Sequence, residues 1–222
     1  MTADKVKLHP VTPHQKRIFE LADRIRNGAV ALLPTDSQYA LGCEYTNKKG
    51  LERIRQIRRL DADHLFTLIC DSLSGISRFA HLSDANFKLI KRLIPGPYTF
   101  VLPATKEVPR LLLHPRRKTI GFRVPEYPIC EKLIEELGNP LLTTTARIPD
   151  YQDGEFASVD REELFHKLEK QVDVIIDNEQ PLHSSQTTIL DLTGDEPMVL
   201  RKGIGMDRLE DTLSQINIEL QE

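Results

Sequence analysis

Near the start of the chain, apolar residues first recur every three or four positions, as in a helix, and then form an unbroken run, as in a buried strand. Near the start, Thr12-Pro13-His14-Gln15 is typical of a capping box with proline at the first helical position. One helical stripe follows it, made of Ile18, Leu21, Ala22 and Ile25. Asn27-Gly28 ends this helix, and the apolar run 29–33 predicts a strand directly after it.

The same alternation continues to the end of the chain. Further helices are predicted at 50–59, 83–93, 128–137, 160–170 and 206–216, and further strands at 66–70, 98–102, 119–124, 141–145, 172–176, 188–192 and 198–200. Strands separated by helices, with a meander near the C-terminus, indicate an α/β fold with a mixed sheet. The sequence shows no repeat and no convincing linker, so we expect one domain over 1–222, with a mobile surface loop at 150–158.

Composition narrows the class of protein. The 222 residues carry 30 Lys and Arg against 33 Asp and Glu, a net charge of -3, which excludes a globally basic nucleic-acid binder but not a local basic patch. No apolar run is long enough for a membrane span, and we expect a cytoplasmic protein. Three widely spaced cysteines beside apolar residues are typical of reduced packing residues rather than metal ligands or disulfides: Cys43, Cys70 and Cys130.

Three hydroxyl-rich segments adjoin predicted strands, at 34–37, 143–147 and 184–188. Ligands of α/β sheets settle where strands end, and Ser and Thr donate to phosphate oxygens without bulk. Arg123, Arg147 and Arg201, at or near strand ends, could supply countercharge to an anionic ligand. Strand and turn propensities of Thr and Ser explain any single segment equally well. The sequence has no G-x-x-x-x-G-K-[ST] loop and no G-x-G-x-x-G fingerprint.

Several ordered segments from about Asn27 to about Gly205 resemble the threonylcarbamoyl-adenylate synthase family, often called YrdC/YciO-like. They are GAVALLPTDSQYALGC, IRQIRRLDADHLFTLIC, PGPYTFVLPAT, KTIGFRVPEYPIC, NPLLTTTARIPD and QTTILDLTGDEPMVLRKGIG. The resemblance implies a twisted α/β sheet with a large, basic, concave cleft. Active members combine L-threonine, bicarbonate and ATP into an adenylated threonylcarbamate for tRNA adenosine modification, and some members are described as binding double-stranded RNA or tRNA.

The resemblance also assigns roles to residues of this chain. It implies that Thr35, Ser37 and Tyr39 wall the small-substrate end of the site. It implies nucleotide contacts for six residues: Arg58, Arg123, Thr143, Thr145, Thr187 and Arg201.

Two departures from the family pattern bear on activity. The Lys-x-Arg motif of active synthases aligns with Arg58-Arg59-Leu60, and their Ser-x-Asn motif aligns with Thr145-Ala146-Arg147. Leu60 donates no hydrogen bond, and Arg147 cannot accept one as Asn does. The departures resemble the YciO branch, whose members lack the full synthase motifs.

Two functions therefore stand. The first is binding of double-stranded RNA or tRNA, and of a nucleotide, through a basic surface made of Arg58, Arg59, Arg116, Arg117, Lys118, Arg123 and Arg147. The second is a slow nucleotidyl transfer with ATP and L-threonine, in which Mg²⁺ accompanies ATP and catalysis is mostly positioning. The simpler explanation of the arginines of the second helix, at 53, 55, 58 and 59, is a solvated helix face.

Overall fold

The computed structural model describes residues 2–61, 63–149, 151, 159–182, 185–216 and 218–220. The chain folds as two compact units: unit 1 is Met1–Asp61 with Tyr127–Ser184, and unit 2 is Ala62–Glu126 with Ser185–Glu222. A single domain over 1–222 stays a prediction. Ser184 and, apart from Tyr151, the predicted loop 150–158 lie outside the described residues.

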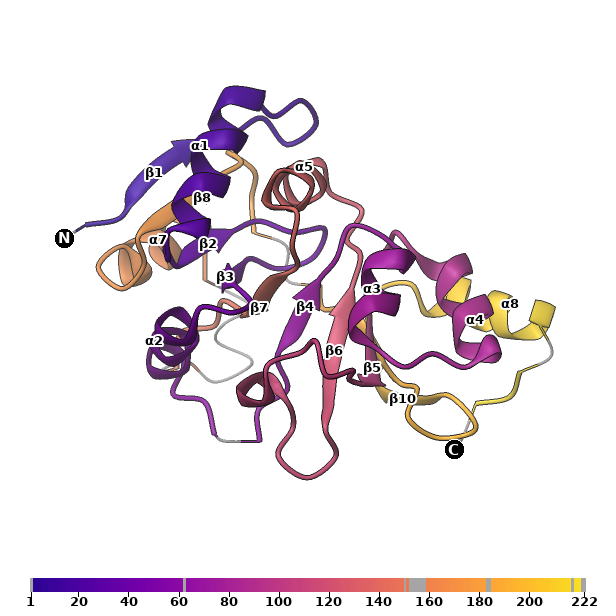
Figure 1. Ribbon diagram of the computed structural model, residues 1–222. Helices are drawn as coiled ribbons and strands as arrows, with labels where there is room; N and C mark the ends of the chain where they lie inside the picture. Colours follow the sequence, from indigo (N-terminus) through magenta and orange to yellow (C-terminus); the bar gives the residue numbers. More distant parts are fainter. Residues whose placement is uncertain are drawn as a thin grey trace. The chain divides into compact units, whose positions relative to one another are not determined.

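The described strands of unit 1 lie in the order β1, β8, β2, β3, β7 (Figure 1). Their bounds are Asp4–Lys7 (β1), Val174–Asp177 (β8), Ala31–Leu33 (β2), Ala40–Glu44 (β3) and Leu141–Thr145 (β7). β8 pairs in parallel with β1 and β2, whereas β3 pairs antiparallel with β2 and β7. This part of the chain therefore holds the mixed sheet that the sequence predicts.

The helices of unit 1 bury the stripes that the sequence indicates. They are α1 (Gln15–Arg26), α2 (Lys48–Arg58), α5 (Pro128–Leu137) and α7 (Arg161–Leu168). α1 packs against α5, and α2 packs against β3 (Figure 1). The predicted inward residues are all buried: Ile18, Leu21, Ala22, Ile25, Leu51, Ile54 and Ile57. Gly138 ends α5 at a φ of 67°, and the Asp160 carboxylate accepts the Glu163 N–H at the start of α7.

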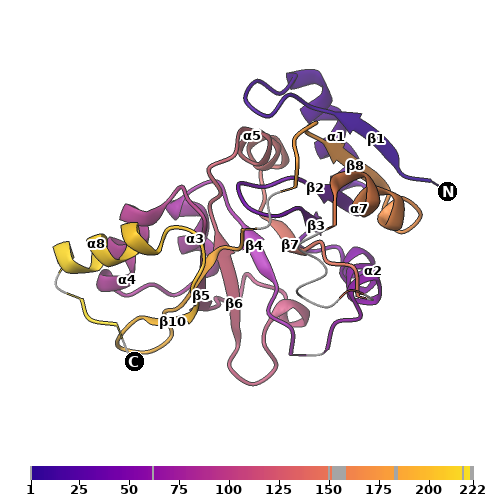
Figure 2. The ribbon, with the colours of Figure 1, turned by 180° about the vertical axis from the view of Figure 1, so that it is seen from behind.

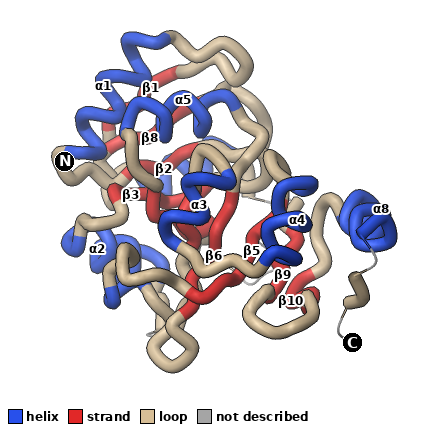
Figure 3. The backbone as a smooth tube through the Cα atoms, turned by 45° about the vertical axis from the view of Figure 1, so that its right-hand side comes forward, coloured by secondary structure: helices blue, strands red, loops and turns tan. Residues whose placement is uncertain are grey.

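The described strands of unit 2 lie in the order β4, β6, β5, β9, β10. Figure 3 labels the last four of them. Their bounds are Thr67–Ile69 (β4), Thr119–Arg123 (β6), Tyr98–Pro103 (β5), Thr188–Asp191 (β9) and Met198–Arg201 (β10). β4 with β6 and β5 with β9 are parallel pairs, whereas β5 with β6 and β9 with β10 are antiparallel. Unit 2 is thus also a mixed α/β body.

The helices of unit 2 are α3 (Leu73–Phe79), α4 (Asp84–Leu93) and α8 (Met206–Ile216), with the short 3₁₀ helix η1 (Arg110–Leu112). α4 packs against both α3 and α8, as Figure 2 shows from behind. The Ser83 hydroxyl accepts the Asn86 N–H at 3.1 Å, which confirms the predicted cap of α4. Large aromatic side chains fill the core: Phe66, Phe79, Tyr98, Phe100 and Phe122 are fully buried.

The structure corrects the start of the first helix. α1 begins at Gln15, two residues later than the capping box predicts, and the His14 side chain makes no cap bond. The reason is local, because the His9 Nδ1 atom lies 3.0 Å from both the backbone N and the hydroxyl of Thr12. Thr12 therefore stabilises the preceding turn instead of the helix.

Four of the elements in the described residues were not predicted: β1, β3, α3 and the short 3₁₀ helix η1. In β3, Gly42 obscured the strand pattern, yet a Cβ at this position would lie 3.0 Å from the Leu33 side chain and 3.1 Å from that of Leu141. The glycine allows the neighbouring strands to pack closely. No helix in the described part of the chain is long and apolar enough to cross a membrane.

Candidate functional site

The turn 34–39 between β2 and β3 is held by its own hydroxyl groups. The Thr35 hydroxyl donates to the Gln38 carbonyl at 2.7 Å and accepts the Ser37 N–H at 3.2 Å. The Ser37 hydroxyl lies 3.2 Å from the same Thr35 oxygen, and since the Thr35 proton is already used, Ser37 donates in this contact. Thr35, Ser37 and Tyr39 are all buried, so the three predicted substrate residues form one rigid element.

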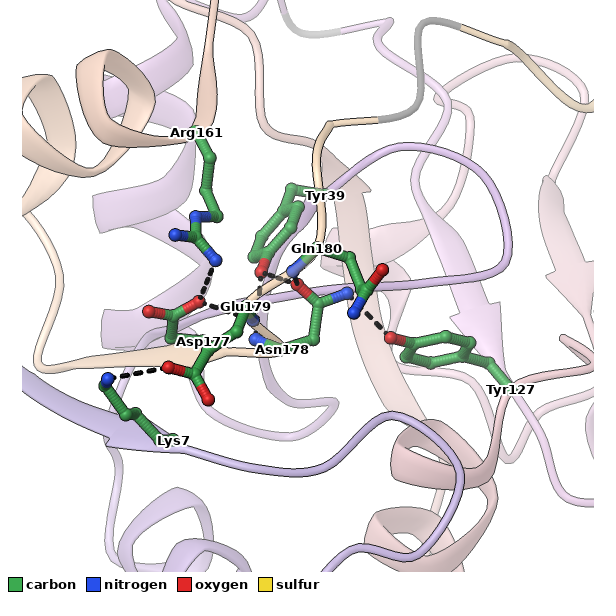
Figure 4. A network of polar contacts seen from close by, with 8 residues as sticks. All are labelled: Lys7, Tyr39, Tyr127, Arg161, Asp177, Asn178, Glu179 and Gln180. Carbon is green, nitrogen blue, oxygen red and sulfur yellow. Dashed lines mark hydrogen bonds and ion pairs between the residues drawn. The ribbon is translucent and has the colours of Figure 1, made fainter.

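A hydrogen-bonded chain joins this turn to the end of β8 and the start of α5 (Figure 4). The Tyr39 hydroxyl donates to the Asn178 Oδ1 atom at 2.8 Å, and the Asn178 Nδ2 atom donates to the Tyr127 hydroxyl at 2.7 Å. The Tyr39 ring packs edge-on against Phe165, with centroids 5.5 Å apart. Burial holds the pKa of Tyr39 far above its ordinary value and also raises the pKa of Tyr127. Both phenols are neutral at physiological pH.

Two ion pairs flank this chain. Arg161 binds the Asp177 carboxylate at 2.9 Å, and the same Asp177 oxygen accepts the Glu179 N–H at 2.8 Å. Lys7 binds Glu179 at 2.7 Å on the exposed side (Figure 4). The pKa of Glu179 is lowered by its hydrogen bond and charge interaction with Lys7. These pairs hold the turn after β8, in which Glu179 adopts a φ of 56°.

The end of β7 contacts the turn 34–39 through the main chain. The Ala146 N–H donates to the Tyr39 carbonyl at 2.8 Å, and Thr143 and Thr145 pair with Gly42 and Ala40 of β3. Thr143 and Thr145 are two residues apart on a strand and therefore share one face of the sheet.

Two basic residues, Arg58 and Arg147, lie beside each other at this point. The Arg58 Nη1 atom, at the end of α2, donates to the Arg147 carbonyl at 3.1 Å, across 89 positions of sequence. Arg59 follows in a left-handed conformation at a φ of 50°, and it is exposed. The predicted basic residues Arg58 and Arg147 are thus brought together in unit 1.

In unit 2, Thr187 and Arg201 form the predicted pair. The Arg201 Nη2 atom donates to the Thr187 hydroxyl at 2.8 Å, and its Nε atom donates to the Thr187 carbonyl at 3.0 Å. The Thr187 hydroxyl also lies 3.2 Å from that of Thr99 on β5. Arg123 ends β6 as predicted, but its residue is only 8% exposed. A guanidinium so placed suits a small anion better than an extended surface.

The basic stretch Arg116, Arg117 and Lys118 lies in an exposed loop of unit 2. The His114 Nδ1 atom accepts the Arg116 and Arg117 N–H groups at 3.3 Å and 3.2 Å, which folds the loop back. The Arg117 side chain binds Asp191 at 3.0 Å, whereas the Lys118 Nζ atom donates to the Pro115 carbonyl at 2.7 Å. Arg117 therefore has a carboxylate partner, which weakens its case as a phosphate ligand.

The three thiols are buried, as the sequence predicts. Burial raises the pKa of Cys43 to about 12 and raises that of Cys70 as well. The Cys130 thiol, in the first turn of α5, donates to the Pro34 carbonyl at 3.3 Å. Within the described residues, no three His, Cys, Asp or Glu side chains are grouped as metal ligands.

Sequence reasoning missed Asn178, Tyr127, Asp177 and Arg161. A signal for two of them exists, because Asp177-Asn178 directly follows the predicted strand 172–176, just as the segment 34–37 directly follows the predicted strand 29–33. The structure groups Thr35, Ser37, Tyr39, Arg58, Arg59, Thr143, Thr145 and Arg147 in unit 1, and Arg116, Arg117, Lys118, Arg123, Thr187 and Arg201 in unit 2. The concave cleft stays a prediction.

Comparisons with known proteins agree with this architecture. The family described as "Telomere recombination" (Sua5/yciO/yrdC) matches residues 23–203. Uncharacterized protein YciO of Escherichia coli is 46% identical over 198 residues, which cover 89% of this chain and 94% of that protein. Its crystal structure superposes with a TM-score of 0.84 and 44% identity, over 91% of this chain and 97% of the other.

More distant relatives include threonylcarbamoyl-AMP synthases. A putative threonylcarbamoyl-AMP synthase of Methanocaldococcus jannaschii is 25% identical over 201 residues, 90% of this chain and 92% of that protein. The crystal structure of P. abyssi Sua5 complexed with L-threonine has a TM-score of 0.83 at 23% identity, over 99% of this chain and 63% of the other. This likeness shows the fold. The chain belongs to the Sua5/YciO/YrdC family, has its YrdC-like mixed α/β fold and is related to the Sua5 threonylcarbamoyl-AMP synthases.

Proposed function

We propose that this chain binds double-stranded RNA or tRNA through its arginines and a nucleotide through Thr187 and Arg201. The observation that carries the proposal is the meeting of Arg58 and Arg147 at the end of β7. A hydrogen bond joins the Arg58 guanidinium to the Arg147 main-chain carbonyl, so two basic residues that are distant in sequence lie beside each other in unit 1. Guanidinium groups recognise phosphate through paired N–H donors, with a geometry that matches two of its oxygens.

The two classes of phosphate ligand draw on different residues. RNA is bound mainly by its backbone and A-form shape, so exposed cations such as Arg59, Arg116 and Lys118 suit it. Arg123 is buried, and Arg201 is held by Thr187, so these two suit a small nucleotide such as ATP. The net charge of -3 limits RNA binding to such local groups.

The test of RNA binding is a titration with a duplex RNA of about 20 base pairs and with tRNA over a series of salt concentrations. Affinity of the wild type is expected to fall steeply as salt rises. Replacing both cations (Arg58→Gln with Arg147→Gln) removes up to two phosphate contacts, which weakens binding and flattens the slope of log affinity against log salt by roughly two. Lys48→Gln, an exposed cation at the other end of α2, is the matched control. Equal affinity of all three proteins overturns the proposal.

A second candidate function, slow synthesis of threonylcarbamoyl-AMP from MgATP, bicarbonate and L-threonine, is favoured by the chain from Tyr39 through Asn178 to Tyr127. Neutral phenol and amide groups match the hydroxyl and the charged ends of an amino acid without imposing a net charge. The related P. abyssi protein was crystallised with L-threonine, and related proteins are named threonylcarbamoyl-AMP synthases. In this candidate function the hydrogen-bonded side chains of Tyr39, Asn178 and Tyr127 position L-threonine, and the arginines stabilise the charge of the transferred adenylate.

Its test is the release of pyrophosphate from ATP when L-threonine and bicarbonate are present. The wild type is expected to be slow because Leu60 supplies no donor and Arg147 places a cation where active synthases carry Asn. Leu60→Arg with Arg147→Asn should raise the rate about tenfold to a hundredfold, the value of one charge-assisted contact tightened in the transition state. The control variant, Leu60→Met with Arg147→Asn, keeps the change at position 147 without adding a donor at position 60, so it shows how much of the rate increase the new arginine causes. A folded repaired variant without any release overturns this candidate.

A further inference from the structure

The side-chain amide of Asn178 has a fixed orientation. The Gln180 backbone N–H, which can only donate, lies 3.2 Å from the Asn178 Oδ1 atom, so this atom must be the acceptor. The Asn178 backbone N–H lies 3.4 Å from the Tyr39 oxygen and donates to it. Two main-chain donors thus determine which end of the amide faces each phenol.

The amide gives the two phenols opposite roles. The Tyr39 hydroxyl donates its proton to the Asn178 Oδ1 atom, so it can only accept a hydrogen bond from any further group. The Tyr127 hydroxyl accepts from the Asn178 Nδ2 atom, so its own proton is not used in this bond. Tyr39 is directed to accept and Tyr127 to donate, although their side chains are chemically identical.

Both phenols lie beside the hydroxyl-bearing turn 34–39. Tyr39 ends this turn, and Tyr127 immediately precedes α5, whose first turn contacts Pro34 through the Cys130 thiol at 3.3 Å. Tyr39 is buried and Tyr127 is half-buried, so the Tyr127 proton is the more accessible of the two. Figure 4 shows Tyr39 and Tyr127 on either side of the Asn178 amide. An acceptor oxygen of a small ligand next to Tyr127 would meet a hydroxyl donor.

We propose that Asn178 is a positioning residue that sets the specificity of the small-substrate site by directing the Tyr127 hydroxyl proton toward an acceptor oxygen of the ligand. The proposal rests on the candidate L-threonine site above. It predicts that Asn178 acts on the ligand only through Tyr127. A residue with a merely structural role would act whether or not the Tyr127 hydroxyl is present.

The test is a calorimetric titration with L-threonine of the wild type, Asn178→Asp, Tyr127→Phe and the double variant. Asn178→Asp keeps the acceptor for Tyr39 and Gln180 but replaces the donor by an acceptor, which takes up the Tyr127 proton. Affinity should fall roughly three- to tenfold in each single variant, the value of one neutral hydrogen bond. The double variant should bind no more weakly than Tyr127→Phe. Gln180→Glu, which adds the same charge two residues away, is the matched control and should change affinity little.

A second measurement needs no ligand. Burial raises the pKa of Tyr127, and the hydrogen bond from Asn178 offsets part of that rise. Asn178→Asp should therefore raise this pKa further, measured as the tyrosine absorbance titration that Tyr127→Phe removes. A wild type that does not bind L-threonine overturns the substrate proposal together with this inference. Unchanged affinity in Asn178→Asp, an equal loss in the Tyr127→Phe background, or an unchanged Tyr127 pKa overturns this inference alone.

Discussion

The two units bury their polar side chains in different ways. In unit 1, a chain of uncharged groups runs from Tyr39 through Asn178 to Tyr127, with the ion pairs of Arg161 and Lys7 set to one side. In unit 2, one guanidinium, that of Arg201, holds the hydroxyl and the carbonyl of Thr187. A neutral chain selects a ligand by its pattern of donors and acceptors, whereas a guanidinium selects an anion. The difference fits the proposed amino-acid site beside Tyr39 in unit 1 and the proposed nucleotide site at Arg201 in unit 2, whereas Arg58 and Arg147 are proposed to bind RNA phosphates.

Alkaline pH should have the largest effect on stability because it ionises buried acids that both units keep neutral, such as Tyr39 and Cys43 in unit 1 and Cys70 in unit 2. Burial raises the pKa of Cys43 from 9.0 to about 12, and it also raises the pKa of Tyr39 far above its ordinary value. A raised folded-state pKa stabilises the fold fully below the unfolded pKa, and this contribution is lost as pH rises through the folded value. Circular dichroism should therefore show steady loss of stability between about pH 9 and pH 12, since the chain has no tryptophan to report on it.

The reactivity of the cysteine thiols, measured below the alkaline transition, tests whether they are buried in the native protein. Cys43, Cys70 and Cys130 should not react with a thiol reagent at pH 8 in the native protein and should all react after unfolding in urea. Rapid reaction of a native thiol would contradict the buried neutral state from which the alkaline transition is argued.

Arg201→Met should remove the proposed nucleotide site of unit 2. Thr187 is buried, and its carbonyl and hydroxyl would each lose a charged donor, so we expect the free energy of unfolding to fall by about 1–3 kcal/mol. ATP affinity, measured by calorimetry, should fall at least tenfold. Arg208→Met is the matched control, because Arg208 also donates to main-chain carbonyls of unit 2. Equal ATP affinity in the two variants would separate Arg201 from nucleotide binding.

Tyr39→Phe should have a smaller effect that is confined to unit 1. It keeps the ring on Phe165 and removes one neutral hydrogen bond, which lowers the free energy of unfolding by about 0.5–1.5 kcal/mol. The rise in melting temperature caused by L-threonine should shrink. Tyr151→Phe, which removes another phenol bonded within unit 1, should leave that rise unchanged. The same reduction in both variants would place L-threonine elsewhere.

The smallest effect is expected from Lys7→Gln. The ion pair of Lys7 with Glu179 is exposed on both sides and is screened by salt. Melting temperature and L-threonine affinity should therefore stay within experimental error of the wild type. A clear loss of affinity would show that the ion pair supports the neutral chain, and the separation of charged and neutral groups in unit 1 would fail.

The sequence predicts much of the fold because helical stripes such as Ile18, Leu21 and Ile25 depend on local spacing. The sequence predicts an element poorly when contacts between residues that are distant along the chain determine whether that element forms. β3 exists because Gly42 lets Leu33 and Leu141 approach, and the Thr12 cap fails because His9 competes for it. The site follows the same rule. Hydroxyl-rich strand ends identify Thr35 and Thr187, whereas the bond between Tyr39 and Asn178 spans 139 positions and has no local signal.

The central claim is that separate parts of the chain bind the amino acid and the nucleotide, and amide hydrogen exchange with each ligand alone tests it most directly. L-threonine should protect amides at 35–39 and 177–180, where the neutral chain lies, and ATP should protect amides at 187–201, where Arg201 holds Thr187. Protection of 187–201 by L-threonine, or of 35–39 by ATP, or of neither segment by either ligand, would contradict the account.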